Sequence, residues 1–145
     1  NINVGIYFYT QAITEEEAVE EADFVIDLIK KYDVTYPVVL DIEETGSSTA
    51  RTAQMSQEDY TKATIAFCER IKEAGYTPMI YGNLKTFMIM LDLEKLEVYE
   101  KWFAYYETPV YFPYEFSVWQ YSSKGKVDGI EGDVDLNVCM KDYSD

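Results

Sequence analysis

The sequence predicts an α/β protein whose strands form a mainly parallel sheet, either open or curled into a barrel. Three observations lead to this prediction. Short apolar runs alternate with amphipathic helical segments along the chain. Several of these runs end in acidic or polar residues, as buried parallel strands do where their carboxyl ends reach solvent. The 145 residues form one domain, 1–145, but a complete eight-unit barrel needs ~250. The chain therefore forms either an incomplete barrel or a smaller α/β sheet.

The first half of the chain contains two strand–helix units. Residues 4–9 are β-branched and aromatic, which predicts a buried strand. Thr14 begins a capping-box pattern, and the helix that follows carries an apolar stripe. A second buried strand is expected at 38–40. Ser56 is the expected N-cap of a second helix, and Gly75 is a suitable C-terminal stop.

The second half of the chain contains the remaining strands. Residues 77–83 predict a strand that ends in polar groups, and a helical stretch with loose boundaries follows from Phe87 to Tyr99. Residues 122–132 hold three glycines and predict turns. Further strands are expected at 102–106, 116–121 and 134–138.

The composition excludes several classes of function. With 27 acidic and 12 basic residues the net charge is -15, so nucleic acid and anionic membrane surfaces are excluded as partners. The chain has no histidine, which rules out Ser-His-Asp and Cys-His catalysis and histidine-ligated zinc. No apolar run approaches the ~20 residues of a membrane span, and no signal peptide is expected at the first residues. Acid–base chemistry in this chain therefore depends on carboxylates.

Asp41 and Glu43 form the clearest candidate site. They are two residues apart at the end of a predicted strand, so both side chains point to one face with Cα atoms about 6.6 Å apart. That spacing allows either carboxylate separation used by glycosidases, ~5–5.5 Å or ~6.5–9.5 Å. Such chemistry needs one protonated and one ionised carboxyl group. The alternative is two solvated acids at a strand end, and Glu44, on the opposite face, is expected to be solvated.

Two other sets of residues are open to more than one interpretation. Asp133 and Asp135 form a second acidic pair, but their spacing is not that of an EF-hand, so we expect a turn rather than a metal site. Aromatic residues make up 16% of the chain, including 14 tyrosines. They fit either a tyrosine-rich core or a groove that stacks sugar rings. Cys68 and Cys139 match no metal-binding spacing, and a single bridge between them is not deducible from the sequence.

Six blocks of the sequence, in this order, resemble the glycoside hydrolase family 25 lysozymes, the N-acetylmuramidases of bacteria and their phages. The blocks are VGIYFY at 4–9, YPVVLDIE at 36–43, FC at 67–68 with GYTPMIYGN at 75–83, WFAYY at 102–106, WQYSSKG at 119–125 and VDLN at 134–137. The resemblance implies an irregular, flattened, TIM-like (β/α) barrel with its site at the carboxyl ends of the strands. It also implies cleavage of the β-1,4 bond between N-acetylmuramic acid and N-acetylglucosamine in peptidoglycan.

The resemblance also implies a role for each candidate residue. Glu43 is expected to be the general acid and then the base, and Asp41 to orient the substrate's 2-acetamido group in a substrate-assisted reaction. Asp135 is expected to be a supporting carboxylate in the cleft. The residues expected to line the sugar groove are Tyr7, Tyr81, Trp102, Tyr106 and Gln120.

Two features of the family do not appear in the sequence. The family begins with a strand that carries an aspartate in an Asp-Val-Ser-like motif, followed by a second βα unit, whereas residues 4–9 resemble its third strand. The resemblance therefore implies an N-terminally truncated catalytic domain, an incomplete barrel that lacks its first βα units and exposes a strand edge. We expect either self-association through that edge or marginal stability, and weak or absent activity.

Three functions remain open at this point. The first is a muramidase that binds peptidoglycan glycan strands and acts outside the cell or at the wall of a bacterium, encoded by the bacterium or by a phage. The second is a non-catalytic glycan-binding module, which the missing first-strand aspartate favours. The third is a purely structural acidic domain. None of the three requires a cofactor or a metal.

Overall fold

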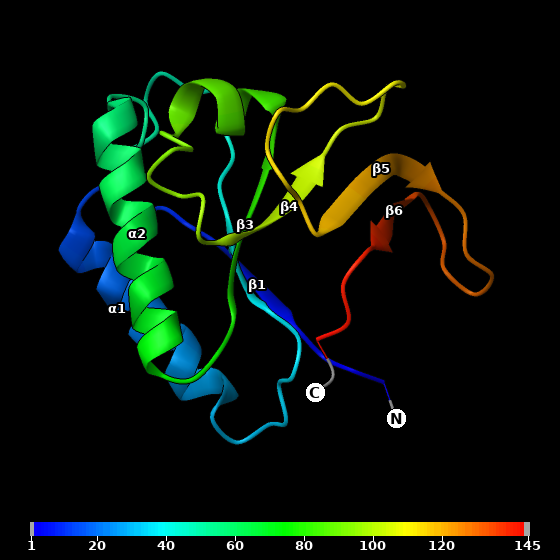
Figure 1. The fold of residues 1–145 in the computed structure, drawn as a ribbon, viewed down its shortest axis with the longest axis horizontal. Coiled ribbons are helices and arrows are strands. Elements are labelled where there is room, and N and C mark those ends of the chain that lie inside the picture. The colour runs from blue at the N-terminus through cyan, green and yellow to red at the C-terminus, as the bar shows by residue number, and fades with distance from the viewer. Residues whose placement is uncertain (1, 144–145) are drawn as a thin grey trace.

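Six strands form one curled sheet whose order follows the chain, from β1 at one edge to β6 at the other (Figure 1). The computed structural model describes residues 2–143. Strands β1 to β5 are parallel, and β6 is antiparallel to β5. The α/β class and the incomplete barrel are therefore confirmed. The strands are β1 (Ile6–Tyr9), β2 (Val38–Asp41), β3 (Pro78–Asn83), β4 (Glu100–Ala104), β5 (Val118–Gly125) and β6 (Val134–Cys139).

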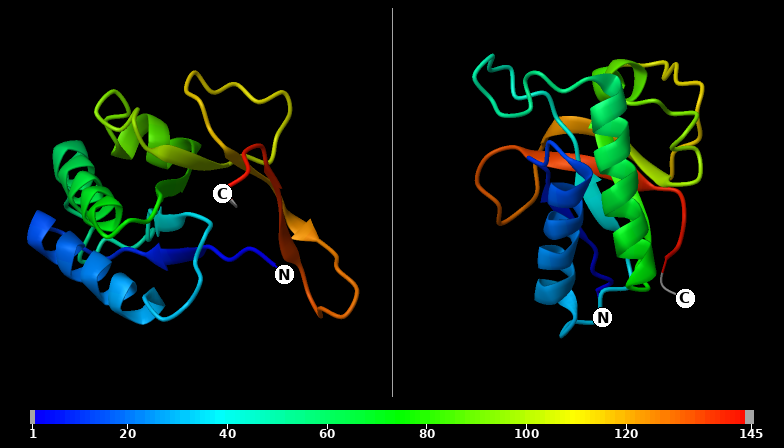
Figure 2. Two further views of the ribbon diagram at one scale, coloured as in Figure 1. Left: turned by 60° about the horizontal axis from the view of Figure 1, so that its bottom comes forward. Right: turned by 90° about the vertical axis from the view of Figure 1, so that its left-hand side faces the viewer.

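Two long helices pack side by side against one face of this sheet (Figure 2). They are α1 (Glu15–Ile29) and α2 (Gln57–Glu73). Their apolar stripes and the sheet residues that face them form the main core, which includes Ala22, Val25, Phe67, Ile71, Leu40, Ile80 and Phe103. The opposite face of the sheet carries a smaller apolar cluster around Val39 and Met79. No helix among residues 2–143 has the length and apolarity of a membrane span.

Both predicted helix starts are present, but only one has the complete capping box. At the start of α2, the Ser56 hydroxyl accepts a hydrogen bond from the Asp59 amide, and the Asp59 carboxylate accepts one from the Ser56 amide. At α1, Thr14 accepts a hydrogen bond from the Glu17 amide at 3.2 Å, as predicted. The Glu17 carboxylate, however, accepts from the amide of Ile13 at 2.9 Å instead of from Thr14. Gly75 follows α2 with φ of 89°, a conformation that favours glycine.

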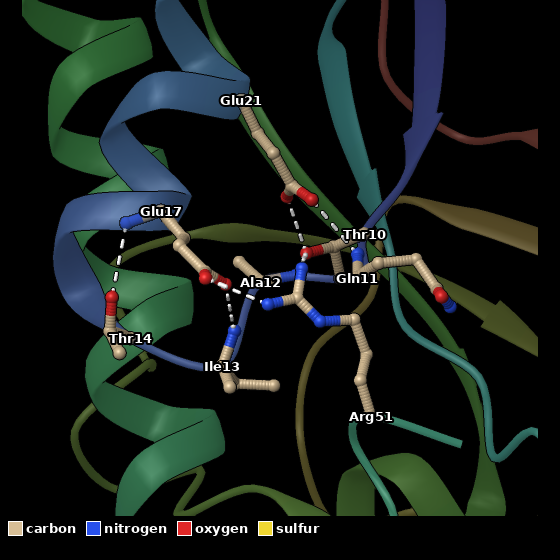
Figure 3. Close-up of polar contacts among 8 residues, drawn as sticks. All are labelled: Thr10, Gln11, Ala12, Ile13, Thr14, Glu17, Glu21 and Arg51. Atoms are coloured by element: carbon tan, nitrogen blue, oxygen red, sulfur yellow. Dashed lines mark hydrogen bonds and ion pairs between the residues drawn. The ribbon is translucent and has the colours of Figure 1, made fainter. Parts of the chain in front are cut away.

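A polar network fixes the chain between β1 and α1 (Figure 3). The Glu21 carboxylate accepts hydrogen bonds from the Thr10 hydroxyl at 2.6 Å and from the Gln11 amide at 2.9 Å. Arg51 donates to Glu17 at 2.7 Å. Because Arg51 lies between β2 and α2, this ion pair joins the loop after β2 to the first turn of α1.

The structure corrects three expectations from the sequence. β1 is not buried on both faces: Ile6 and Phe8 pack against the core, but Tyr7 points to the sheet face that the helices do not cover and is 67% exposed. Self-association through the outer edge of β1 stays a prediction. The helical stretch from Phe87 to Tyr99 contains only the π-helical turn η1 (Thr86–Met90), after which the Asp92 amide bonds the Thr61 hydroxyl of α2 and draws the chain away from a helical path.

The third correction concerns β5, which continues to Gly125 through residues expected to be turns. β6 pairs with it along this length, and the partner of Gly125 is Val134. A Cβ atom on Gly125 would lie 2.4 Å from Cγ of Leu136. Gly125 is therefore a close-packing position in the hairpin and not a turn glycine.

Lys101 supports the irregular segment before β4. Its side chain is buried at 3% exposure, and Nζ donates to the carbonyl oxygens of Leu96, Glu97 and Tyr99 at 3.3, 3.4 and 2.9 Å. Lys101→Met leaves these carbonyls without their donor, and we expect a loss of about 2–3 kcal/mol in the free energy of unfolding. Urea titration measures this loss. The exposed Lys95→Met is the control, and equal effects of both substitutions would contradict the role assigned to Lys101.

Candidate active site

The predicted site residues meet in a pocket of about 210 Å³ on the sheet face opposite the helices. We call this the acidic pocket. Its lining residues are Tyr7, Asp41, Glu43, Tyr81, Trp102, Gln120, Asp135 and Asn137. All of the predicted site residues except Tyr106 are in this set. Their roles stay predictions, but the sheet brings them together from all six strands and the loop after β2.

Strand register explains how distant residues come to lie in one pocket. Asp41 is the partner of Tyr81 in the β2–β3 pairing, and Tyr81 is the partner of Trp102 in the β3–β4 pairing. These three side chains therefore form one row across neighbouring strands. Glu43, two residues beyond Asp41, projects to the same pocket from the end of β2. Asp135 enters from β6, which folds back along β5.

Asp41 is in an unusual environment for a carboxyl group. It is only 7% exposed, and its Oδ1 has no hydrogen-bond partner among the described residues. Burial, followed by the charge of Glu43 and a hydrogen bond with that group, raises the pKa of Asp41 to about 7. Asp41 therefore still holds a proton in a substantial fraction of molecules near neutral pH.

Gln120 links the two tyrosines at the site. Its Oε1 accepts hydrogen bonds from the phenol of Tyr81 at 3.0 Å and from the phenol of Tyr106 at 2.6 Å. Burial raises the pKa of both phenols, so both remain protonated donors. Tyr106, which does not line the acidic pocket, is thus attached to its edge through Gln120.

The aromatic wall of the pocket is also fixed in orientation. The Trp102 indole Nε1 donates to Oδ1 of Asn137 at 2.9 Å, and its ring meets that of Tyr81 edge-on, with centroids 5.0 Å apart. Sequence reasoning did not single out Asn137 as a site residue. The sequence could have indicated Asn137, because it lies two residues after Asp135 on a predicted strand, and this spacing puts both side chains on one face.

Other candidate residues lie away from the pocket. Asp133 pairs with Lys126 at 2.5 Å, so the Asp133–Asp135 pair is split between a turn and the site. Glu44 is exposed, as expected, and it also pairs with Lys85 at 2.5 Å. Within residues 2–143 no group of three or more acidic or cysteine side chains could hold a metal. Cys68 and Cys139 are free, the first buried and the second exposed, so no bridge joins them.

A curled, mainly parallel sheet with carboxylate and aromatic side chains gathered on the face opposite its helices defines an incomplete α/β-barrel domain. The comparison with known families agrees with this class. The family described as Glycosyl hydrolases family 25 matches residues 1–130. The chain therefore belongs to this family.

Individual relatives cover much of this chain but are longer. Uncharacterized protein YegX of Escherichia coli strain K12 is 31% identical over 105 residues, which are 71% of this chain and 36% of YegX. The modular autolysin LytC from Streptococcus pneumoniae, solved with a synthetic peptidoglycan ligand, gives a TM-score of 0.80 at 29% identity, over 94% of this chain and 33% of LytC. The Cpl-1 endolysin, complexed with a peptidoglycan analogue, gives 0.67 at 26%, over 96% of this chain and 40% of Cpl-1. The chain thus spans well under half the length of these proteins.

Proposed function

We propose that this chain hydrolyses the glycan strands of peptidoglycan at the β-1,4 bond between N-acetylmuramic acid and N-acetylglucosamine. The observation that carries the proposal is that Asp41, Glu43 and Asp135 share one pocket with oriented aromatic side chains. Membership of family 25 supports the reaction class. The peptidoglycan ligands in the titles of the LytC and Cpl-1 structures support the choice of substrate.

In this proposal, Glu43 is the proton donor and acceptor. It protonates the glycosidic oxygen as the bond to the anomeric carbon breaks, and then removes a proton from the water that completes hydrolysis. Asp41 positions the substrate's 2-acetamido group, whose carbonyl oxygen attacks the anomeric carbon. Asp135 stabilises the positive charge that develops on the sugar ring. Asp41, whose pKa is raised, is the carboxyl group that retains a proton beside Glu43 near neutral pH.

The aromatic and amide side chains of the site would bind the sugar rings. Trp102 and Tyr7 offer ring faces to the C–H groups of a saccharide, and Gln120 with its two phenols offers hydrogen bonds to its polar edge. Such a substrate places the action of the protein outside the cell or at the wall of a bacterium, whether bacterial or phage-encoded.

The test is digestion of purified peptidoglycan, followed by borohydride reduction and mass spectrometry of the released fragments. The proposal expects new reducing ends that are N-acetylmuramic acid. Reduced N-acetylglucosamine at the new ends would contradict the bond assignment. Binding to peptidoglycan without release of fragments would instead support the glycan-binding module, and the absence of both would support the structural acidic domain.

A further inference from the structure

The outer edge of β1 and the outer side of α1 form one surface, and we propose that this surface binds a second copy of the chain across a two-fold axis. We call it the β1–α1 surface, and its residues are Gly5, Tyr7, Tyr9, Phe24, Leu28 and Tyr32. The dimer does not depend on the proposed function. It extends the association considered at the strand edge to the helix, and it fixes the symmetry.

The backbone of β1 has hydrogen-bonding groups along its outer edge. On the inner side, Ile6 and Thr10 donate their amide hydrogens to carbonyl oxygens of the chain around β2, at 3.2 and 3.1 Å. Because alternate residues of a strand direct their backbone groups to opposite sides, those of Gly5, Tyr7 and Tyr9 point to the outer edge. No strand in the described part of the chain pairs with this edge. Such an edge is a template for pairing with another chain.

α1 and the turn after it carry a stripe of exposed apolar side chains next to that edge. Phe24, Leu28 and Tyr32 recur every four residues and are 56%, 52% and 63% exposed. The ring of Phe24 meets the ring of Phe8 in β1 edge-on, with centroids 6.2 Å apart, and α1 lies over the β1 side of the sheet (Figure 2). Asp23 forms an ion pair with α2 at 2.6 Å, whereas Phe24 and Leu28 are turned about 100° and 140° from it around the helix. The stripe therefore faces the open edge and not α2.

One two-fold axis satisfies both parts of the β1–α1 surface. Antiparallel pairing of two β1 edges around Tyr7 brings the backbone groups of Gly5 opposite those of Tyr9 in the second copy, as a hydrogen-bonded pair. An axis perpendicular to the sheet keeps both α1 helices on the same face and makes them antiparallel. Because Phe24 contacts β1, the two apolar stripes then lie together and cover each other. An interface of this isologous kind closes at two copies.

The charges beside the stripe favour a second copy as the partner. Glu20 lies one turn before Phe24 and Lys31 one turn after Leu28, and both charged side chains are exposed. In an antiparallel helix pair, Glu20 of each helix lies near Lys31 of the other, so opposite charges meet twice. The net charge of -15 makes two copies repel each other at long range. Salt at about 0.15 M screens this repulsion beyond about 8 Å, so the close contacts determine the association.

The experiment measures the mass of the chain in solution by sedimentation equilibrium, at about 0.15 M salt and from about 1 μM to about 100 μM protein. The wild type is expected to reach twice the mass of one chain. Leu28→Glu is expected to weaken the dimer at least about tenfold, because the symmetry introduces the charge twice into an apolar contact. Val98→Glu is the matched control, since it adds the same charge at an exposed apolar side chain before β4, and it is expected to leave the dimer unchanged.

A charge exchange tests the antiparallel geometry without altering the apolar contact. Lys31→Glu puts like charges opposite each other and is expected to weaken the dimer about threefold to tenfold, and combining it with Glu20→Lys is expected to restore the wild-type affinity. Both residues are exposed, so these variants decide the test if Leu28→Glu lowers the helix content measured by circular dichroism. A wild type that keeps the mass of one chain throughout the concentration range overturns the proposal. So does a dimer that Leu28→Glu and Lys31→Glu leave unchanged, or one that the double exchange does not restore.

Discussion

Glu43→Gln is expected to lower the rate of peptidoglycan hydrolysis by about 10³-fold, the size of a general acid–base contribution. Glutamine has nearly the same shape as glutamate but cannot transfer a proton. Glu43 is exposed, and its charge repels that of the buried Asp41, so the substitution is expected not to lower the free energy of unfolding. The measurement is the release of reducing ends from purified peptidoglycan by equal amounts of both proteins, together with urea unfolding of each.

The neighbouring Glu44 provides the matched control. Glu44→Gln removes the same charge one residue along the chain, but Glu44 pairs with Lys85 and does not line the acidic pocket. We expect hydrolysis by this variant to stay within about twofold of the wild-type rate, since an exposed ion pair contributes little. Retained activity in Glu43→Gln would show that another group is the acid. An equal loss in both variants would point to net charge and not to proton transfer.

Much of the fold could be predicted because the relevant signals are local. The caps at Thr14 and Ser56 and the apolar stripes behind them place both long helices. The predictions were wrong where contacts between residues far apart in the sequence determine the structure. The exposure of Tyr7 depends on which face of the sheet the helices cover, and the early end of η1 depends on the hydrogen bond from the Asp92 amide to the Thr61 hydroxyl. Neither is visible in a local pattern.

The candidate site was predictable to a different degree. Alternation along a strand was sufficient to put Asp41 and Glu43 on one face, and they do line one pocket. The sequence did not indicate which carboxyl group has the raised pKa. That property of Asp41 comes from burial by neighbouring strands and from the position of Glu43, both of which are tertiary. The aromatic residues divide in the same way: Phe103 is in the core and Trp102, its neighbour, lines the pocket.

Asp41 is expected to make the protein less stable as the pH rises. In the folded chain its pKa is about 7, against an ordinary value of 3.8. Below both values the group is protonated in either state and has no effect. Between them the unfolded chain has released a proton that the folded chain still holds, so each rise in pH favours unfolding until about pH 7. Above pH 7 the destabilisation is complete, because the folded state then carries a buried charge.

Asp41→Asn removes this titration, since asparagine is neutral in both states. Relative to the wild type, we expect its free energy of unfolding to rise by about 2 kcal/mol between pH 5 and pH 8. Urea titrations of both proteins at the two pH values give the difference between their free energies of unfolding. Groups that titrate alike in both proteins cancel from this difference. Asp33→Asn, which removes an exposed carboxylate after α1, is the control for net charge. A constant difference between wild type and Asp41→Asn would mean that Asp41 is ionised throughout. Asp41 would then carry its charge beside Glu43 at both pH values, and the raised pKa assigned to Asp41 would be wrong.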